Sequence, residues 1–224
     1  MADARTQELR ERYVAAQLAG DRQEALRLVL EDGIAAGVPA PELELHVIEP
    51  AQHEIGRLWE ENRISVAQEH LATAISQLVL AHLYRHLPRA EPLGRDVVVA
   101  CVEGELHDMG ARVAADLLEC AGYDVHYLGA NVPTDSLVAL VREREPDLVA
   151  LSATMAHHLP SLRRTLDRLC ETMGGEYPVA VGGGALVGGG LEAVQGRVLT
   201  CATVQTLIDA GPALFEGSRA RGAA

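Results

Sequence analysis

The residues best suited to chemistry lie in one short segment, which follows an apolar run that we expect to be a strand. His107 lies there, two residues after Glu105. A neutral imidazole is a good ligand for a mid-row transition metal, and a nearby carboxylate can hold its other ring nitrogen. A metal site built only from protein needs more donors than this segment offers, whereas a metal already held by a macrocycle needs only one. The segment therefore favours a macrocyclic metal complex ligated by His107, although a lone histidine is more often an ordinary loop residue.

Two further segments with unusual residues follow later apolar runs. Ser152 and Thr154 end one run, and three glycines, 182–184, end another. Glycines at the end of a strand remove side chains where something flat or bulky must approach the backbone closely. The polar pair also has an ordinary interpretation, since it could simply end a strand. No G-x-G-x-x-G motif follows the first run and no G-x-x-x-x-G-K-[ST] motif occurs, so dinucleotides and nucleoside triphosphates are disfavoured.

The composition excludes several classes of function. The chain has 224 residues, with 19 basic and 32 acidic side chains and a net charge of −13. This balance argues against a nucleic-acid surface and against a polybasic membrane contact. No apolar run approaches the ~20 residues that span a bilayer. The first residues are charged and helix-prone, unlike a secretory signal, and the four cysteines form no C-x-x-C pair, so we expect a cytoplasmic protein with reduced thiols.

The first part of the chain predicts helices only. Asp21 can cap a second helix, Pro41 suits the first turn of a third helix with a kink at Pro50, and Ser65 with Gln68 forms the signature of a capping box at the start of a fourth. Short loops between four helices are typical of a four-helix bundle. We therefore predict a helical bundle domain over residues 1–90.

The second part alternates apolar strands with helices, which is typical of a parallel sheet covered on both faces. We predict an α/β domain over residues 95–218, with five parallel strands in the flavodoxin-like (Rossmann-like) order 2-1-3-4-5. In such sheets, ligands bind at the carboxyl ends of the strands, where all three unusual segments fall. The strands are expected at 96–102, 124–129, 147–154, 178–184 and 197–200, and the helices at 110–121, 134–144, 161–173 and 203–215.

The three segments together resemble the cobalamin (vitamin B12)-binding domain of methionine synthase, corrinoid methyl-carrier proteins and cobalamin-dependent photoreceptors. The motif runs Glu105-x-His107-x-x-Gly110, then Ser152-x-Thr154 after 41 residues and Gly182-Gly183 after 27 more. The resemblance implies that His107 is the lower axial ligand of cobalt. The Ser/Thr and glycine segments would line a channel for the displaced nucleotide tail. Two positions depart from the usual pattern: Glu105 replaces an Asp, as in the photoreceptor branch, and Thr154 replaces a Leu.

The helical part resembles the cap of the adenosylcobalamin photoreceptor branch, through Trp59 and the pair Glu69-His70, with nine residues between them. The resemblance implies that the Trp covers the upper face of the corrin and that the Glu and His frame the upper-ligand pocket. Light-sensing members often carry a further cobalt-ligating His directly after the Trp. Here that residue is Glu60, so His53 or His70 would have to substitute.

These resemblances imply a cobalamin-binding sensor, with light as the expected signal, rather than an enzyme. We expect adenosylcobalamin as cofactor, with methylcobalamin or hydroxocobalamin as alternatives, and signalling or transcription regulation through a protein partner or self-association. No DNA-binding domain is expected before the bundle. The alternatives are a corrinoid methyl-carrier subunit and a cobalamin store. The expected cofactor-binding residues are Trp59, Glu69, His70, Gly104, Glu105, Leu106, His107, Asp108, Met109, Gly110, Ser152, Thr154, Gly182, Gly183 and Gly184.

Overall fold

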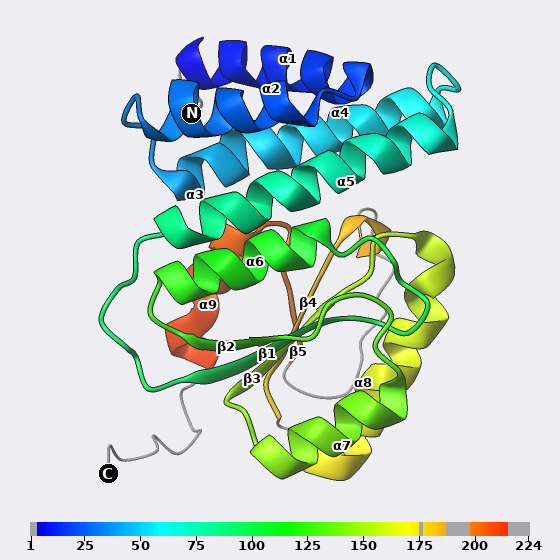
Figure 1. Ribbon diagram of the computed structural model, residues 1–224. Helices are drawn as coiled ribbons and strands as arrows, with labels where there is room; N and C mark the ends of the chain where they lie inside the picture. Colours follow the sequence, from blue (N-terminus) through cyan, green and yellow to red (C-terminus); the bar gives the residue numbers. More distant parts are fainter. Residues whose placement is uncertain (1–3, 175–176, 187–197, 215–224) are drawn as a thin grey trace. The chain divides into compact units, whose positions relative to one another are not determined.

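The computed structural model describes residues 4–174, 177–186 and 198–214. The chain divides into two compact units, Met1–Pro88 and Arg89–Ala224 (Figure 1). The predicted end of the second domain, at 218, lies outside the described residues. Each unit is described by itself below.

The N-terminal unit consists of four continuous helical stretches, which confirms the predicted bundle. Pro50 lies in the first turn of α4, and the irregularity expected there takes the form of π-helical turns just before it. Proline has no N–H to donate one turn back, and wider turns accommodate this loss. The elements are α1 (Ala4–Ala19), α2 (Arg22–Arg27), a π-helical segment (Leu28–Ile34), α3 (Ala40–Leu43), a second π-helical segment (Glu44–Ile48), α4 (Glu49–Glu60), α5 (Val66–Leu83) and a 3-10 turn (Tyr84–His86).

The side chains predicted to cap the starts of α2 and α5 make the expected hydrogen bonds. Asp21 accepts a hydrogen bond from the backbone N–H of Glu24 at 3.0 Å. At the start of α5 the backbone N–H of Gln68 donates to Ser65 Oγ at 3.3 Å, and the N–H of Ser65 donates to Gln68 Oε1 at 2.9 Å. The capping box is therefore complete, and it fixes where α5 begins after the short link from α4.

The C-terminal unit has the predicted parallel sheet, in the order β2-β1-β3-β4-β5. The two sides of β1 pack against different helices: Val98 and Ala100 lie in a core with α7 and α8, whereas Val97 and Val99 lie in a core with α6 and α9. Both faces of the sheet are thus covered (Figure 1). The elements are β1 (Asp96–Cys101), α6 (Met109–Cys120), β2 (Asp124–Tyr127), α7 (Thr134–Arg144), β3 (Leu148–Ser152), a 3-10 turn (Ala156–His158), α8 (Leu159–Met173), β4 (Val179–Gly182), a 3-10 turn (Gly184–Leu186), β5 (Val198–Thr200) and α9 (Val204–Leu214).

Strands β1 to β4 end one to two residues earlier than the apolar runs suggest, and β5 ends where expected. The ends of β1, β3 and β4 lie side by side. Cys101 at the end of β1 pairs with Ser152 of β3, and Ser152 pairs with Gly182 of β4. This register brings the segments that follow β1, β3 and β4 to one edge of the sheet.

Gly183 at this edge has φ +105°, and a Cβ atom there would lie 2.3 Å from the carbonyl oxygen of Ala153. We expect Gly183→Ala to lower the free energy of unfolding by about 2–4 kcal/mol, because backbone strain adds to a clash with rigid backbone. The measurement is urea unfolding of the full chain. Gly129→Ala is the matched control, because its φ is +79° but nothing lies within 4 Å of its Cβ position. If both substitutions lowered the free energy of unfolding equally, the contact between residue 183 and the Ala153 carbonyl oxygen would not contribute to the loss.

Candidate functional site

The carboxylate of Glu105 lies at the centre of the three segments, and its residue is completely buried. Its Oε1 atom accepts hydrogen bonds from the backbone N–H of His107 at 2.9 Å and from His107 Nδ1 at 2.5 Å. Its Oε2 atom accepts from the N–H groups of Thr154 at 2.7 Å and Met155 at 3.1 Å, and from His158 Nδ1 at 2.8 Å. One side chain therefore joins the loop after β1 to the turn after β3.

The charge of Glu105 follows from this environment. Burial by itself raises the pKa of the carboxyl, but the hydrogen bonds from His107, His158 and Met155 outweigh it and lower the pKa to about 2. An ionised carboxylate only accepts hydrogen bonds, so both imidazoles must carry their proton on Nδ1.

His107 is therefore held in the tautomer that metal ligation requires. Its Nδ1–H points to Glu105, which leaves the lone pair of Nε2 available, and 53% of its side chain is exposed. Leu106 beside it is 70% exposed. A nitrogen that could ligate a metal thus lies next to an exposed apolar side chain, which suits a metal held in a flat, largely apolar macrocycle. One imidazole oriented by a carboxylate is the protein ligand expected from the sequence, and these residues fit a corrinoid.

The remaining residues of this loop are fixed around Glu105. Gly104 has φ +92°, and its N–H donates to Asn131 Oδ1 at 2.8 Å. The N–H of Asn131 in turn donates to the carbonyl oxygen of Glu105 at 2.8 Å. Asp108 precedes α6 and accepts a hydrogen bond from the Tyr127 hydroxyl at 3.1 Å. The expected loop residues Met109 and Gly110 form the start of α6, and open space surrounds the Cβ position of Gly110.

Two residues in this site were not predicted. His158 follows β3, only 13% of its side chain is exposed, and its Nδ1 donates to Glu105. Asn131 follows β2 with φ +52°, and its side chain accepts the N–H of Gly104. Their positions after β3 and β2, at the same edge as Glu105, were the available signal.

The Ser/Thr and glycine segments act here through their backbone. Thr154 contributes its N–H to Glu105, and Ser152 accepts the N–H of Val102 on its carbonyl oxygen at 3.1 Å. Cβ atoms at Gly183 and Gly184 would lie 2.3 Å and 3.0 Å from the carbonyl oxygens of Ala153 and Thr154. The backbone of Ala153 and Thr154 therefore approaches these two glycines closely. A Cβ atom at Gly182 would lie 3.5 Å from the carbonyl oxygen of Cys201, which is an ordinary van der Waals distance.

The predicted residues of the N-terminal unit lie on either side of the short turn that joins α4 to α5. Trp59 lies in the last turn of α4 and is 38% exposed, a large value for the only tryptophan. Glu69 and His70 lie near the start of α5. Glu69 Oε2 accepts from His70 Nδ1 at 2.5 Å, and Glu69 Oε1 accepts from the Thr73 hydroxyl at 2.8 Å. His53 lies on α4 and is exposed.

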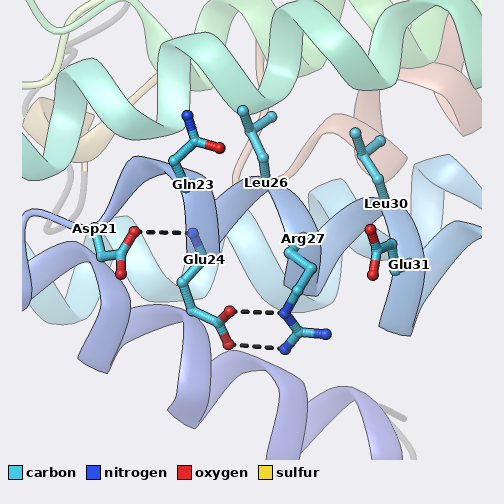
Figure 2. A pocket seen from close by; sticks show the side chains of 7 residues that line it. All are labelled: Asp21, Gln23, Glu24, Leu26, Arg27, Leu30 and Glu31. Carbon is cyan, nitrogen blue, oxygen red and sulfur yellow. Dashed lines mark hydrogen bonds and ion pairs between the residues drawn. The ribbon is translucent and has the colours of Figure 1, made fainter.

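A surface pocket of about 490 Å³ lies elsewhere in this unit, along α2 and the π-helical segment after it (Figure 2). Arg27 at its edge is held by Glu24 through two hydrogen bonds, of 2.7 Å and 2.8 Å. The pocket contains none of the expected cofactor-binding residues. None of the helices in the described part of the chain has the length and apolar character needed to cross a membrane.

Two family models match the chain, and both are described as a B12 binding domain. One matches residues 9–84 and the other residues 95–192. The HTH-type transcriptional repressor CarH of Myxococcus xanthus is 38% identical over 178 residues, which are 79% of this chain and 58% of the repressor. Dimethylamine corrinoid protein 1 of Methanosarcina acetivorans is 27% identical over 145 residues, 64% of this chain and 62% of that protein. The chain thus spans less than two thirds of the length of either relative.

A solved structure shares the fold. The monomethylamine corrinoid protein of Methanosarcina barkeri superposes with a TM-score of 0.80 at 20% sequence identity, over 94% of this chain and 98% of that chain. The two B12-binding models fall on the two units of the structure and together span most of the sequence. The resemblance seen in the sequence is confirmed: the chain belongs to the B12-binding domain family.

Proposed function

We propose that this protein is a cobalamin-binding sensor that uses adenosylcobalamin to respond to light. The observation that carries the proposal is the pair Glu105–His107, which presents a free Nε2 lone pair for cobalt beside the exposed Leu106. In this proposal His107 is the lower axial ligand. The loop residues 104–110, Ser152, Thr154 and Gly182–Gly184 support it and form the path of the nucleotide tail.

Trp59, Glu69 and His70 would provide the upper-ligand pocket. An exposed tryptophan offers a flat apolar surface to an upper group, and the carboxylate and imidazole beside it offer polar contacts. An alkylcobalamin supplies a cobalt–carbon bond that visible light breaks. Loss of the upper group would change what contacts Trp59, Glu69 and His70, and this change would shift the protein between two arrangements or two association states. His53 or His70 would be the replacement ligand afterwards.

The identity of the relatives supports regulation as the role. The repressor CarH is more similar in sequence than the dimethylamine corrinoid protein, with 38% against 27% identity. The acidic charge of −13 disfavours direct contact with nucleic acid, so we propose that the signal passes to a protein partner or through self-association in the cytoplasm.

The second candidate is a corrinoid methyl carrier in a methyltransferase system. The observation that favours it is the group of corrinoid proteins from Methanosarcina among the relatives. A methyl carrier must let a partner enzyme reach the cobalt, so its upper pocket should accept methylcobalamin at least as well as adenosylcobalamin.

Illumination separates these two functions. We expect the protein loaded in the dark with adenosylcobalamin to change its absorption spectrum on exposure to visible light, together with its hydrodynamic size or its binding to a partner. Size-exclusion chromatography of the dark and illuminated samples is the measurement, with the methylcobalamin-loaded protein measured in parallel. A spectral change without any change in size or partner affinity would contradict sensing.

His107→Ala tests the lower ligand. We expect the variant to bind cobalamin with the spectrum of a complex lacking a lower imidazole, or to lose the cofactor, because it removes the single nitrogen placed for cobalt. His157→Ala is the control, since His157 is exposed at the same edge of the sheet and we expect its spectrum to match the unaltered protein. If His107→Ala has that spectrum too, the axial assignment is wrong.

Glu105→Gln tests the support of this ligand in the cofactor-free protein. The amide has one acceptor oxygen, and its NH2 group would face N–H donors, so we expect a loss of about 2–4 kcal/mol in the free energy of unfolding at neutral pH. Because the pKa of Glu105 is lowered from 4.5 to about 2, this difference should be full above pH 4.5 and shrink as the pH falls toward 2. Glu103→Gln is the control: that carboxylate is 44% exposed and paired with Arg164, so its loss should cost under about 1 kcal/mol. Similar costs for both variants would refute the anchoring role.

A further inference from the structure

A hydrogen-bonded network of polar side chains runs through the interior of the bundle and ends at Glu69. Beginning at the surface, Glu69 Oε1 accepts from the Thr73 hydroxyl at 2.8 Å, and Thr73 Oγ1 accepts from Gln52 Nε2 at 2.9 Å. Gln52 lies on α4 whereas Thr73 and Glu69 lie on α5, so the second bond crosses between helices.

The network continues into the core. Gln52 Oε1 accepts from Gln17 Nε2 at 2.7 Å and from the Ser76 hydroxyl at 3.0 Å. Ser76 Oγ lies 3.0 Å from the Tyr13 hydroxyl. Tyr13 and Ser76 are completely buried and Gln17 is 1% exposed. Both Tyr13 and Gln17 belong to α1, so the network ties three helices of the bundle to one carboxylate.

The direction of these hydrogen bonds is fixed by the two ends of the network. Gln17 Nε2 also donates to the carbonyl oxygen of Ala72 at 3.1 Å, and a carbonyl can only accept. The nitrogen of Gln17 must therefore face Ala72 and Gln52, the oxygen of Gln52 must face Gln17, and the nitrogen of Gln52 must face Thr73. With its oxygen accepting from Gln52, the Thr73 hydroxyl has its proton left for Glu69.

Within the described part of the chain, this orientation of the amides leaves one buried acceptor atom without a hydrogen bond. Gln17 Oε1 is buried and has no hydrogen-bond partner among the residues that the structure describes. A network that served only to fill the core would be expected to satisfy its members. Here Gln17 Oε1 is left without a hydrogen bond from any described residue at the inner end of the network. At the outer end the Thr73 hydroxyl donates to Glu69, whose side chain is 19% exposed.

We propose that Thr73 and Gln52 are positioning residues, which hold the Glu69 carboxylate in one orientation for the upper group of the cofactor. This inference rests on the proposed function of Glu69. The Thr73 hydroxyl and the His70 imidazole each occupy one carboxylate oxygen, so the carboxylate cannot turn freely and its remaining lone pairs have fixed directions. An adenosyl group carries hydroxyl donors that a fixed carboxylate can bind, and a methyl group carries none. The network would therefore favour adenosylcobalamin over methylcobalamin.

Thr73→Val tests the inference, because valine keeps the shape of threonine and removes the hydroxyl. We expect the preference of the full chain for adenosylcobalamin over methylcobalamin, measured as the ratio of dissociation constants in the dark, to fall by about tenfold. The affinity for methylcobalamin and the spectral signature of the lower ligand should not change. Thr73→Ser keeps the hydroxyl and should restore the preference. Gln52→Met should reproduce the loss by a substitution on the other helix, and it serves if valine prevents folding.

A second measurement uses the cofactor-free protein. In Thr73→Val the side-chain NH2 signals of Gln52 and the carboxyl carbon signal of Glu69 should shift in NMR spectra, whereas in Thr73→Ser they should stay near those of the unaltered protein. Trp59→Ala should weaken the selection of the upper group without moving these signals.

The outcomes separate the two ideas. Equal losses of affinity for both cobalamins in Thr73→Val, or a loss of stability alone, would overturn the positioning role while the proposed function stands. Unmoved Gln52 and Glu69 signals would overturn it as well. An unaltered protein that shows no preference between the cobalamins would refute the role assigned to Glu69, and the inference would fall with it.

Discussion

The C-terminal unit depends on one buried carboxylate that accepts hydrogen bonds from two loops. Glu105 binds the N–H and Nδ1 of His107 with one oxygen, and the turn after β3 with the other. A buried charge is stable only when it is fully hydrogen-bonded, so neither loop can move without exposing or orphaning it. The orientation of His107, its tautomer and the shape of the edge all follow from this constraint.

The sheet makes that arrangement possible. Parallel register places Cys101, Ser152 and Gly182 in one row, so the segments that follow them start side by side. Gly183 and Gly184 let the segment after β4 lie against the backbone of Ala153 and Thr154. The next two N–H groups of that turn, those of Thr154 and Met155, donate to Glu105. The glycines therefore support the histidine indirectly, through backbone packing.

Each unit contains a glutamate that accepts a hydrogen bond from a histidine, but different groups hold the two glutamates in place. In each, a glutamate accepts from the Nδ1 of a histidine at 2.5 Å and leaves the Nε2 atom free: Glu105 with His107, and Glu69 with His70. In the sheet unit the carboxylate is held by backbone N–H groups, which are rigid. In the bundle the carboxylate belongs to a hydrogen-bonded network of side chains on three helices, which connects Glu69 to α1. The two glutamates therefore differ in what orients them: backbone N–H groups and imidazoles at Glu105, and a series of side-chain hydrogen bonds at Glu69.

The sequence by itself determined the elements, the strand order and the family, because hydrophobic periodicity, capping residues such as Ser65 and Gln68, and spaced motifs are local properties of the chain. Glu105 and His107 were found this way because they lie two residues apart. His158, Asn131 and the Gln52–Thr73 network were not, because their roles come from neighbours far along the chain: 53 residues separate His158 from Glu105, and 21 separate Gln52 from Thr73. Only the tertiary structure decided which polar side chains are buried together, since burial makes a hydrogen bond obligatory and no single segment specifies it.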